Sequence, residues 1–130
     1  MRKQHGQHNL DLTEIIFNNS GFNDWVVTTA FYSSVHFVEY ALFPLIEDGF
    51  EYVTFNDYWD IKFRPKKVTK HGCKTKLVRT YLRSVSTQYR NLLDDCNTAR
   101  YNDYNVNDLI SLRAKMAATE IKTACLLIKA

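Results

Sequence analysis

The spacing of apolar residues along the chain predicts a helical protein. From Asn23 to about Phe43, apolar side chains recur every three to four positions on two faces of one expected helix. One face carries Val27, Phe31, Val35, Val38 and Leu42, and the other carries Trp25, Thr29, Tyr32, His36, Tyr40 and Phe43. Because a helix that is apolar on two faces must be covered on both, we expect it at the centre of the fold, with Asn23 as its N-cap and Pro44 as its stop.

Three further segments show helical spacing. The pattern predicts a short helix over residues 9–18, a long one over about 69–93 with Thr69 as N-cap, and a last one from Asn105 or Asn107 to the C-terminus. The Asn- and Asp-rich run at 94–105 is expected to form a loop. These elements predict one all-α domain over residues 1–130, an antiparallel four-helix bundle with room for a fifth short helix.

Residues 47–68 form the exception, because they lack helical spacing and are expected to be a long connection between the second and third helices. They carry six large aromatic side chains among acidic residues and a basic end. Connections of this length are often functional. The alternatives are a short pair of strands or a cover over the open end of the bundle.

Composition narrows the class further. The chain has 130 residues, of which 45% are hydrophobic and 24% charged, as in soluble globular domains. Four Gly and two Pro are too few for a turn-rich β-sandwich or barrel. No apolar stretch is as long as a membrane span, and the polar start is unlike a signal peptide. Three widely spaced cysteines without a CxxC motif indicate neither a disulfide framework nor a zinc site. We therefore expect a cytoplasmic protein without metal or cofactor.

The charges are strongly segregated along the chain. Residues 1–60 contain two basic and nine acidic side chains, whereas residues 62–90 contain ten basic and no acidic ones. Such a run attracts phosphates or an acidic protein surface. The alternative is a solvated helix face paired with the acids of the first half of the chain.

Three segments together resemble a known family. They are DWVVTTAFYSSVHFVEYALF at 24–43, HGCKTKLVR at 71–79 and YRNLLDDCNTARY at 89–101. The most specific parts are W-x6-Y-x3-H-x2-E in the first and the T-A-R-Y turn at 98–101. Over residues 9–128 the chain is similar to small members of the HEPN superfamily, the nucleotide-binding domains of higher eukaryotes and prokaryotes.

The resemblance implies a helical bundle that pairs into a homodimer. Many relatives are metal-independent endoribonucleases, often toxins or antiphage effectors, with an R-x4–6-H motif. Others are inactive modules that bind nucleotides or partner proteins, frequently a nucleotidyltransferase. The matching motif here is Arg64-x6-His71, with Pro65 after the arginine and Lys70 where relatives usually carry Asn or Asp. Catalytic and non-catalytic readings therefore both remain open.

Metal-independent RNA cleavage needs a group that moves protons and positive charge on the phosphate. His71 is the candidate for proton transfer, and Arg64 or Arg79 for gripping the phosphate. The basic segment adds Lys67 and Lys74 as candidate substrate contacts. The alternative reading has His71 as an exposed residue at a helix start and Arg79 as a salt-bridge partner.

Tyr32, His36 and Glu39 are spaced to project from one helix face, where Glu39 is expected to fix the tautomer of His36. They are candidate substrate-binding residues or, alternatively, a buried polar network.

Arg100 is a further candidate for RNA contact, or a partner of Glu39 or Asp24. Its neighbour Tyr101, also a candidate substrate contact, is expected to pack under the bundle. A homodimer is predicted, with the basic helices of about 69–93 near the shared groove, because Tyr81, Val85 and Tyr89 lie there beside basic residues, a mixture common at interfaces.

Overall fold

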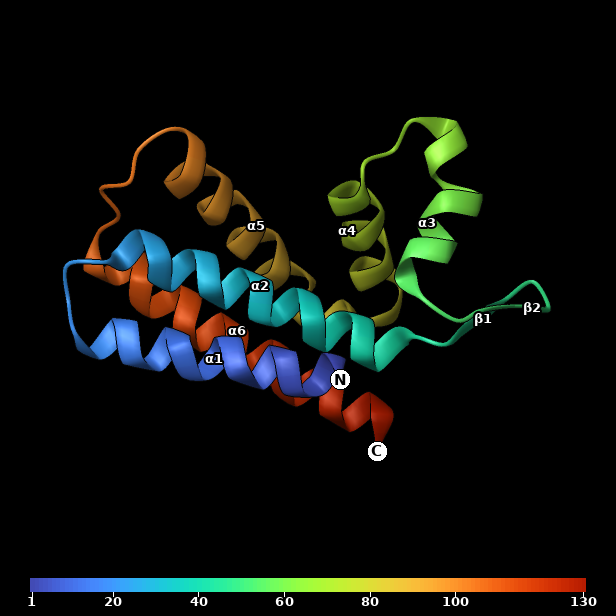
Figure 1. Ribbon diagram of the computed structural model, residues 1–130, viewed down its shortest axis with the longest axis horizontal. Helices are drawn as coiled ribbons and strands as arrows, with labels where there is room; N and C mark the ends of the chain where they lie inside the picture. The colour runs from blue at the N-terminus through green and yellow to red at the C-terminus, as the bar shows by residue number, and fades with distance from the viewer.

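The central element is α2 (Asn23–Leu42), in which thirteen of twenty residues are buried. In Figure 1 the helices α1 (Arg2–Asn18), α5 (Ser86–Tyr101) and α6 (Asp108–Lys129) lie around α2, and all three contact it. The prediction of a central helix that ends just before Pro44 is confirmed, and the face from Val27 to Leu42 is buried as expected. The expectation that its second face is also covered is wrong, because none of the six residues of that face, from Trp25 to Phe43, is buried. Asn23 is not the N-cap, because its amide instead donates to the Val106 carbonyl (2.9 Å) and to Asp108 (2.8 Å) at the start of α6.

The structure is a computed structural model that describes residues 1–130. It is mostly helical, and its one sheet is a two-stranded antiparallel hairpin. The other helices are α3 (Phe55–Lys62) and α4 (Lys70–Tyr81), the strands are β1 (Leu45–Glu47) and β2 (Phe50–Tyr52), and 3-10 turns span Arg64–Lys66 and Arg83–Val85. No helix in the protein is both long and apolar enough to traverse a lipid bilayer.

The first helix begins seven residues earlier than predicted. Its start is polar, so periodicity gives no signal there, but Gly6 is buried where α1 crosses α2. A Cβ added at Gly6 would lie 2.9 Å from the Phe37 ring, and the Ser33 hydroxyl donates to the Gly6 carbonyl at 2.7 Å. This close approach anchors the N-terminal turns of α1 and brings Arg2 and His5 to the polar face of α2.

The predicted third helix is two helices. The chain leaves helical geometry at Leu82 and turns through Arg83–Val85, in a stretch whose Ser and Thr residues are weak helix formers. The second piece, α5, continues through the predicted loop, since Leu92, Cys96 and Ala99 are buried at helical spacing. Tertiary burial thus outweighs the Asn and Asp residues of this run.

Two predicted caps are confirmed. The Thr69 hydroxyl accepts from the Gly72 N–H at 3.0 Å at the start of α4, and the Asn107 side chain accepts from the Ile110 N–H at 2.8 Å at the start of α6. Both side chains satisfy a backbone donor that has no partner within its helix.

The 47–68 connection is ordered into the β1–β2 hairpin, α3 and a 3-10 turn. Tyr52, Phe55 and Tyr58 are buried and join the main core. The alternative of a short pair of strands is therefore confirmed by the hairpin, although α3 was not foreseen. In Figure 1 the hairpin, α3 and α4 form an arm beside the other four helices.

The predicted dimer contact is wrong in part. Val85 and Tyr89 are buried inside the protomer, Tyr89 completely. Only Tyr81 of the three is exposed, and its hydroxyl donates to Glu47 at 2.6 Å.

Candidate functional site

Two histidines from different helices stack in a polar pocket on α1, α2 and α5. The rings of His5 on α1 and His36 on α2 are parallel within 21° with centroids 3.7 Å apart. The pocket, called here the histidine pocket, has a volume of about 370 Å³ and is lined by His5, Asn9, Trp25, Thr28, Thr29, Tyr32, His36 and Arg100. It holds two imidazoles, a guanidinium and an indole, which suits an anionic ligand with an aromatic part.

Arg2 fixes the state of His36. Its Nη1 lies 3.2 Å from His36 Nδ1. Because a guanidinium can only donate, Nδ1 is the acceptor and the proton of the neutral ring is on Nε2. Burial, followed by the charges of the neighbouring His5, Arg2 and Lys74, lowers the pKa of His36 to about 4. At neutral pH, His36 is therefore an uncharged donor through Nε2.

The far wall of the pocket is formed by Arg100 on α5. Its Nη1 donates to the Tyr32 hydroxyl at 2.8 Å, across 68 positions of sequence. It pairs with neither Glu39 nor Asp24, the partners that the sequence suggested. Its guanidinium remains exposed and lies 5.5 Å from the Tyr101 ring. Tyr101 is 73% exposed, so the expectation that it packs under the bundle is wrong.

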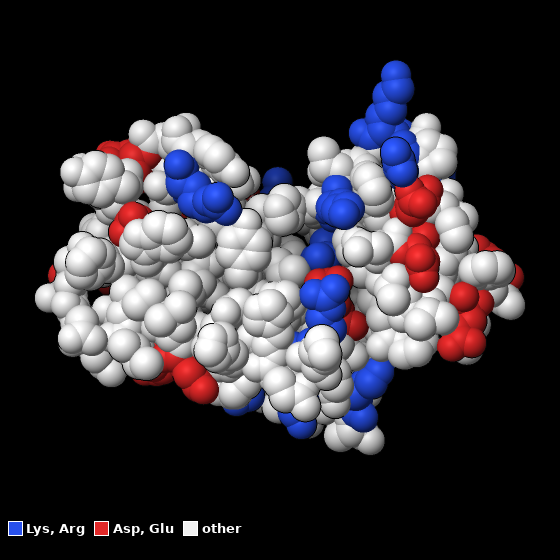
Figure 2. Space-filling view, in the orientation of Figure 1, with Lys and Arg blue, Asp and Glu red and all other residues white.

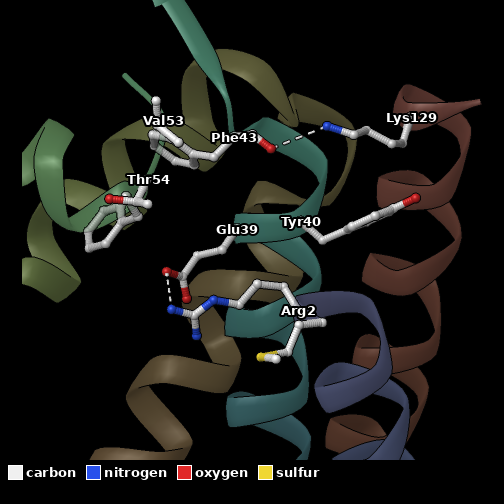
Figure 3. A pocket seen from close by; sticks show the side chains of 9 residues that line it. Arg2, Glu39, Tyr40, Phe43, Val53, Thr54 and Lys129 are labelled. Carbon is white, nitrogen blue, oxygen red and sulfur yellow. Dashed lines mark hydrogen bonds and ion pairs between the residues drawn. The ribbon is translucent and has the colours of Figure 1, made fainter. Parts of the chain in front are cut away.

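Behind the histidine pocket, a carboxylate lies between two cations. Glu39, which is 8% exposed, is 3.5 Å from Lys74 Nζ and 3.6 Å from Arg2 Nη2. Figure 3 shows the Arg2 side chain reaching across to this carboxylate. Burial lowers the pKa of Lys74, and the attraction of Glu39 opposes that shift.

The geometry favours the polar-network alternative for Glu39, whose side chain is buried and paired. Lys74, a predicted substrate contact, is instead its buried partner. Arg2, not Glu39, contacts His36 and fixes its tautomer. We call Arg2, Glu39 and Lys74 the Glu39 cluster. It ties α1, α2 and α4 together.

The predicted catalytic trio is distributed over the arm. Arg64 pairs with Asp60 at 2.8 Å, and its guanidinium lies over the Trp59 ring. The His71 ring packs on Phe31 with centroids 5.5 Å apart. No hydrogen bond, ion pair or ring contact joins Arg64, His71 and Arg79. Burial against the core, followed by the charge of Lys74, lowers the pKa of His71.

Arg79 belongs to a second polar cavity, the α4–α5 groove. This groove has a volume of about 440 Å³ and is lined by Gly72, Thr75, Lys76, Arg79, Ser86, Thr87, Arg90, Leu93 and Asp94. Lys76, Arg79 and Arg90 form no ion pair, although Asp94 is among the lining residues. Three free cations and several hydroxyl groups make the groove a suitable surface for phosphates.

The ten cations of the basic segment (residues 62–90) agree in part with each of the two interpretations that the sequence allowed. Lys62, Arg64 and Lys74 pair with acids of the first half, as the solvated-face alternative predicted. The other seven form no ion pair: Lys66, Lys67, Lys70, Lys76, Arg79, Arg83 and Arg90. Among them, Lys67 is exposed beyond α3, where it has a left-handed backbone. In Figure 2 basic atoms gather near the centre of the face, beside the hollow between the arm and the other helices.

Sequence reasoning missed Arg2, His5 and Asn9. They are spaced at i, i+3 and i+7, so they share a face of α1. This spacing is visible in the sequence, but the segment lacks the apolar residues from which a helix would be predicted there. Trp25 was noted as an apolar position and as part of the W-x6-Y-x3-H-x2-E motif, but not as a candidate site residue, although it is 53% exposed and lines the histidine pocket.

The His, Cys, Asp and Glu side chains do not gather in groups of three or more that could hold a metal ion. No protein-family model, curated protein or solved structure matches the chain. The chemistry of the two polar cavities is therefore judged from their own residues.

Proposed function

We propose that this protein binds single-stranded RNA. In this proposal the histidine pocket binds a nucleotide, and the α4–α5 groove contacts the phosphate backbone. The observation that carries the proposal is the stacked His5–His36 pair facing Arg100 and Trp25 in one pocket. An arginine fork recognises phosphate oxygens, and an exposed indole provides a surface on which a base stacks. The seven unpaired cations of the basic segment supply the sequence-independent attraction that RNA binding requires.

The resemblance to the HEPN superfamily supports the same substrate class. In this proposal the chain is a HEPN-like protein of the cytoplasm with toxin or defence roles, and α1, α2, α5 and α6 are its four-helix bundle. Its dimer contact moves from Val85 and Tyr89, which are buried, to the exposed apolar residues Ile15 and Phe22.

Cleavage of RNA without metal is the further step that the pocket suits. The 2′-hydroxyl attacks the adjacent phosphorus, its proton passes to a base, and the leaving 5′-oxygen takes a proton from an acid. The products are a 2′,3′-cyclic phosphate and a 5′-hydroxyl. His5 is the exposed imidazole for proton transfer, while the Nε2–H of His36 and the guanidinium of Arg100 hold the phosphate.

The test is binding and cleavage of a labelled mixed-sequence RNA in the presence of a metal chelator. His5→Gln is compared with His8→Gln, since His8 is exposed on the same helix but forms no hydrogen bond, ion pair or ring contact. We expect His5→Gln to weaken binding about fivefold or more and to abolish cleavage, with His8→Gln unchanged. Equal behaviour of the two variants would refute the assignment to the histidine pocket. Absence of wild-type binding at low salt would refute RNA as the ligand.

A second candidate is a non-catalytic module that binds a protein such as a nucleotidyltransferase. It is favoured by the apolar surface of Ile15, Ile16, Phe22 and Trp25, three of which are more than half exposed. Phe22→Ser removes part of this surface. In sedimentation experiments, the proposed dimer should dissociate when Phe22 is changed. A protein that does not dimerise through this surface should be monomeric before and after the change.

A further inference from the structure

We propose that a third cavity binds a small organic anion, namely a flat apolar body carrying one carboxylate or phosphate group. The cavity, called here the Tyr40 pocket, lies where the start of α1 and the ends of α2 and α6 meet the segment before α3. It has a volume of about 330 Å³ and is lined by Met1, Arg2, Glu39, Tyr40, Phe43, Val53, Thr54, Phe55 and Lys129. This proposal goes beyond RNA binding and does not depend on it.

The walls of the pocket are suited to an apolar ring. Phe43 and Val53 lie on one side in Figure 3, and Tyr40 extends from the neighbouring turn of α2. Phe55 also lines the pocket. Phe43 and Phe55 meet edge to face with centroids 6.0 Å apart, which fixes their orientation. The volume is near the lower end of small-molecule sites, about 300–1,000 Å³, so a single ring with a short substituent fits.

The charges of the pocket are unbalanced toward positive. Glu39 is the one acidic side chain in the lining, and it is already shared between Arg2 and Lys74. Lys129 pairs with no acid: its Nζ donates to the Phe43 carbonyl at 3.2 Å and lies 5.5 Å from the Tyr40 ring. A carbonyl and a ring balance none of its charge, so an anion entering the pocket gains a charge-assisted bond without breaking an ion pair.

The two features together define the ligand class. An inorganic phosphate would lose hydration against apolar walls without filling them. An uncharged ring would fill the walls and leave Lys129 without a counter-charge. A ring that carries an anionic group satisfies both, with its charged end directed toward Lys129 and Arg2.

Arg2 gives this pocket a connection to the histidine pocket. One end of its guanidinium contacts Glu39, which lines the Tyr40 pocket, while the other contacts His36 Nδ1 at 3.2 Å. An anion that draws Arg2 toward itself therefore lengthens the contact with His36. Binding in the Tyr40 pocket should therefore change the environment of the His36 ring in the histidine pocket.

The experiment is calorimetric titration of the full chain with phenyl phosphate and with benzoate, which distinguish the two anionic groups. Inorganic phosphate and benzyl alcohol each supply only half of the proposed ligand. We expect at least one aromatic anion to bind with Kd below about 1 mM, and both half-ligands to bind about tenfold more weakly or not at all. No binding of either aromatic anion, or equal binding of the half-ligands, would overturn the proposal.

Two variants locate the site. Lys129→Gln should weaken binding about fivefold or more. Lys122→Gln, on the same helix and outside the pocket lining, should leave binding within about twofold. Val53→Trp should block the pocket, and circular dichroism checks that both variants remain helical. The His36 ring signal in NMR should shift on addition of the aromatic anion. Binding that survives both Lys129→Gln and Val53→Trp, or that leaves His36 unmoved, would contradict the assignment.

Discussion

The Glu39 cluster and the α4–α5 groove use the same kinds of charged residue in opposite ways. In the cluster, Lys74 is 6% exposed and shares a buried carboxylate with Arg2. In the groove, Arg79 and Arg90 are exposed and pair with nothing. Lys74 and Arg79 lie only five residues apart on α4, so the difference arises from which face of the helix each occupies.

This contrast separates a structural role of charge from a binding role. A buried ion pair that loses one partner leaves an uncompensated charge in the interior, which is strongly destabilising. Exposed cations without partners add little to stability but attract a polyanion over a distance set by salt. The first region should respond to mutation in folding, and the second in RNA binding.

The largest expected effect is loss of stability on changing Lys74→Ala. The substitution leaves Glu39 buried with only Arg2, which is partly exposed, as a counter-charge. We expect the free energy of unfolding to fall by about 3–5 kcal/mol in urea denaturation. Lys70→Ala, on the exposed face of the same helix, is the matched control and should cost less than about 1 kcal/mol. Equal effects of the two changes would remove the distinction between the regions.

The double variant with Arg79→Gln and Arg90→Gln should lose RNA binding and keep its stability, the reverse of Lys74→Ala. Removing two phosphate contacts is expected to weaken RNA binding about tenfold or more at low salt and to reduce the slope of log Kd against log salt concentration by about 1–2. The free energy of unfolding should change by less than about 0.5 kcal/mol. Fluorescence anisotropy over a series of salt concentrations measures the slope. An unchanged slope would show that RNA does not use the groove.

The pH dependence of stability should reveal the neutral state of His36. Its pKa is lowered from 6.5 to about 4 in the folded protein, so as pH falls the unfolded chain takes up the proton first. Stability is therefore present above pH 6.5 and is lost as pH falls toward 4. With allowance for solvent screening of this partly exposed ring, we expect a loss of about 1 kcal/mol between about pH 7 and pH 5. His36→Gln should flatten this part of the curve, and His8→Gln should not.

The smallest effect is expected in the hairpin contact of the arm. Tyr81→Phe removes the hydroxyl that donates to Glu47. Burial tends to raise the pKa of Glu47, but hydrogen bonds from Lys62, Tyr81 and Tyr58 outweigh it and lower the pKa. Since Tyr81 is exposed and Lys62 still pairs with Glu47, the free energy of unfolding should fall by about 0.5–1 kcal/mol. A loss above about 2 kcal/mol in urea denaturation would mean that the hairpin is held mainly by this hydroxyl.

The parts of the fold that could be predicted are those with an apolar face. The pattern of α2 identified the central helix, and Thr69 and Asn107 identified two helix starts, because burial and capping are local signals. The start of α1 and the extension of α5 depend instead on tertiary contacts. Gly6 is helical because it lies against Phe37, and nothing in its neighbourhood of the sequence shows that contact.

The sequence predicted only some of the residues of the candidate site. Tyr32, His36 and Arg100 were found from the face of one helix and from the family resemblance, and the structure brings them into one pocket. His5 was missed because it reaches the pocket from a polar segment, 31 positions before His36. Arg2, which lies on the same segment and contacts His36, was missed for the same reason. The Arg64–His71 pairing came from the R-x4–6-H motif that the family resemblance implies, and in the fold each side chain has another partner.

The central claim is that one RNA molecule contacts the histidine pocket and the α4–α5 groove together. The most direct measurement is an NMR titration with a short single-stranded RNA that follows the ring signals of His5 and His36 and the guanidinium signals of Arg79 and Arg90. The account predicts that both sets shift and saturate at the same concentration of RNA. Shifts of the arginine signals alone, with both histidine rings unmoved, would contradict it.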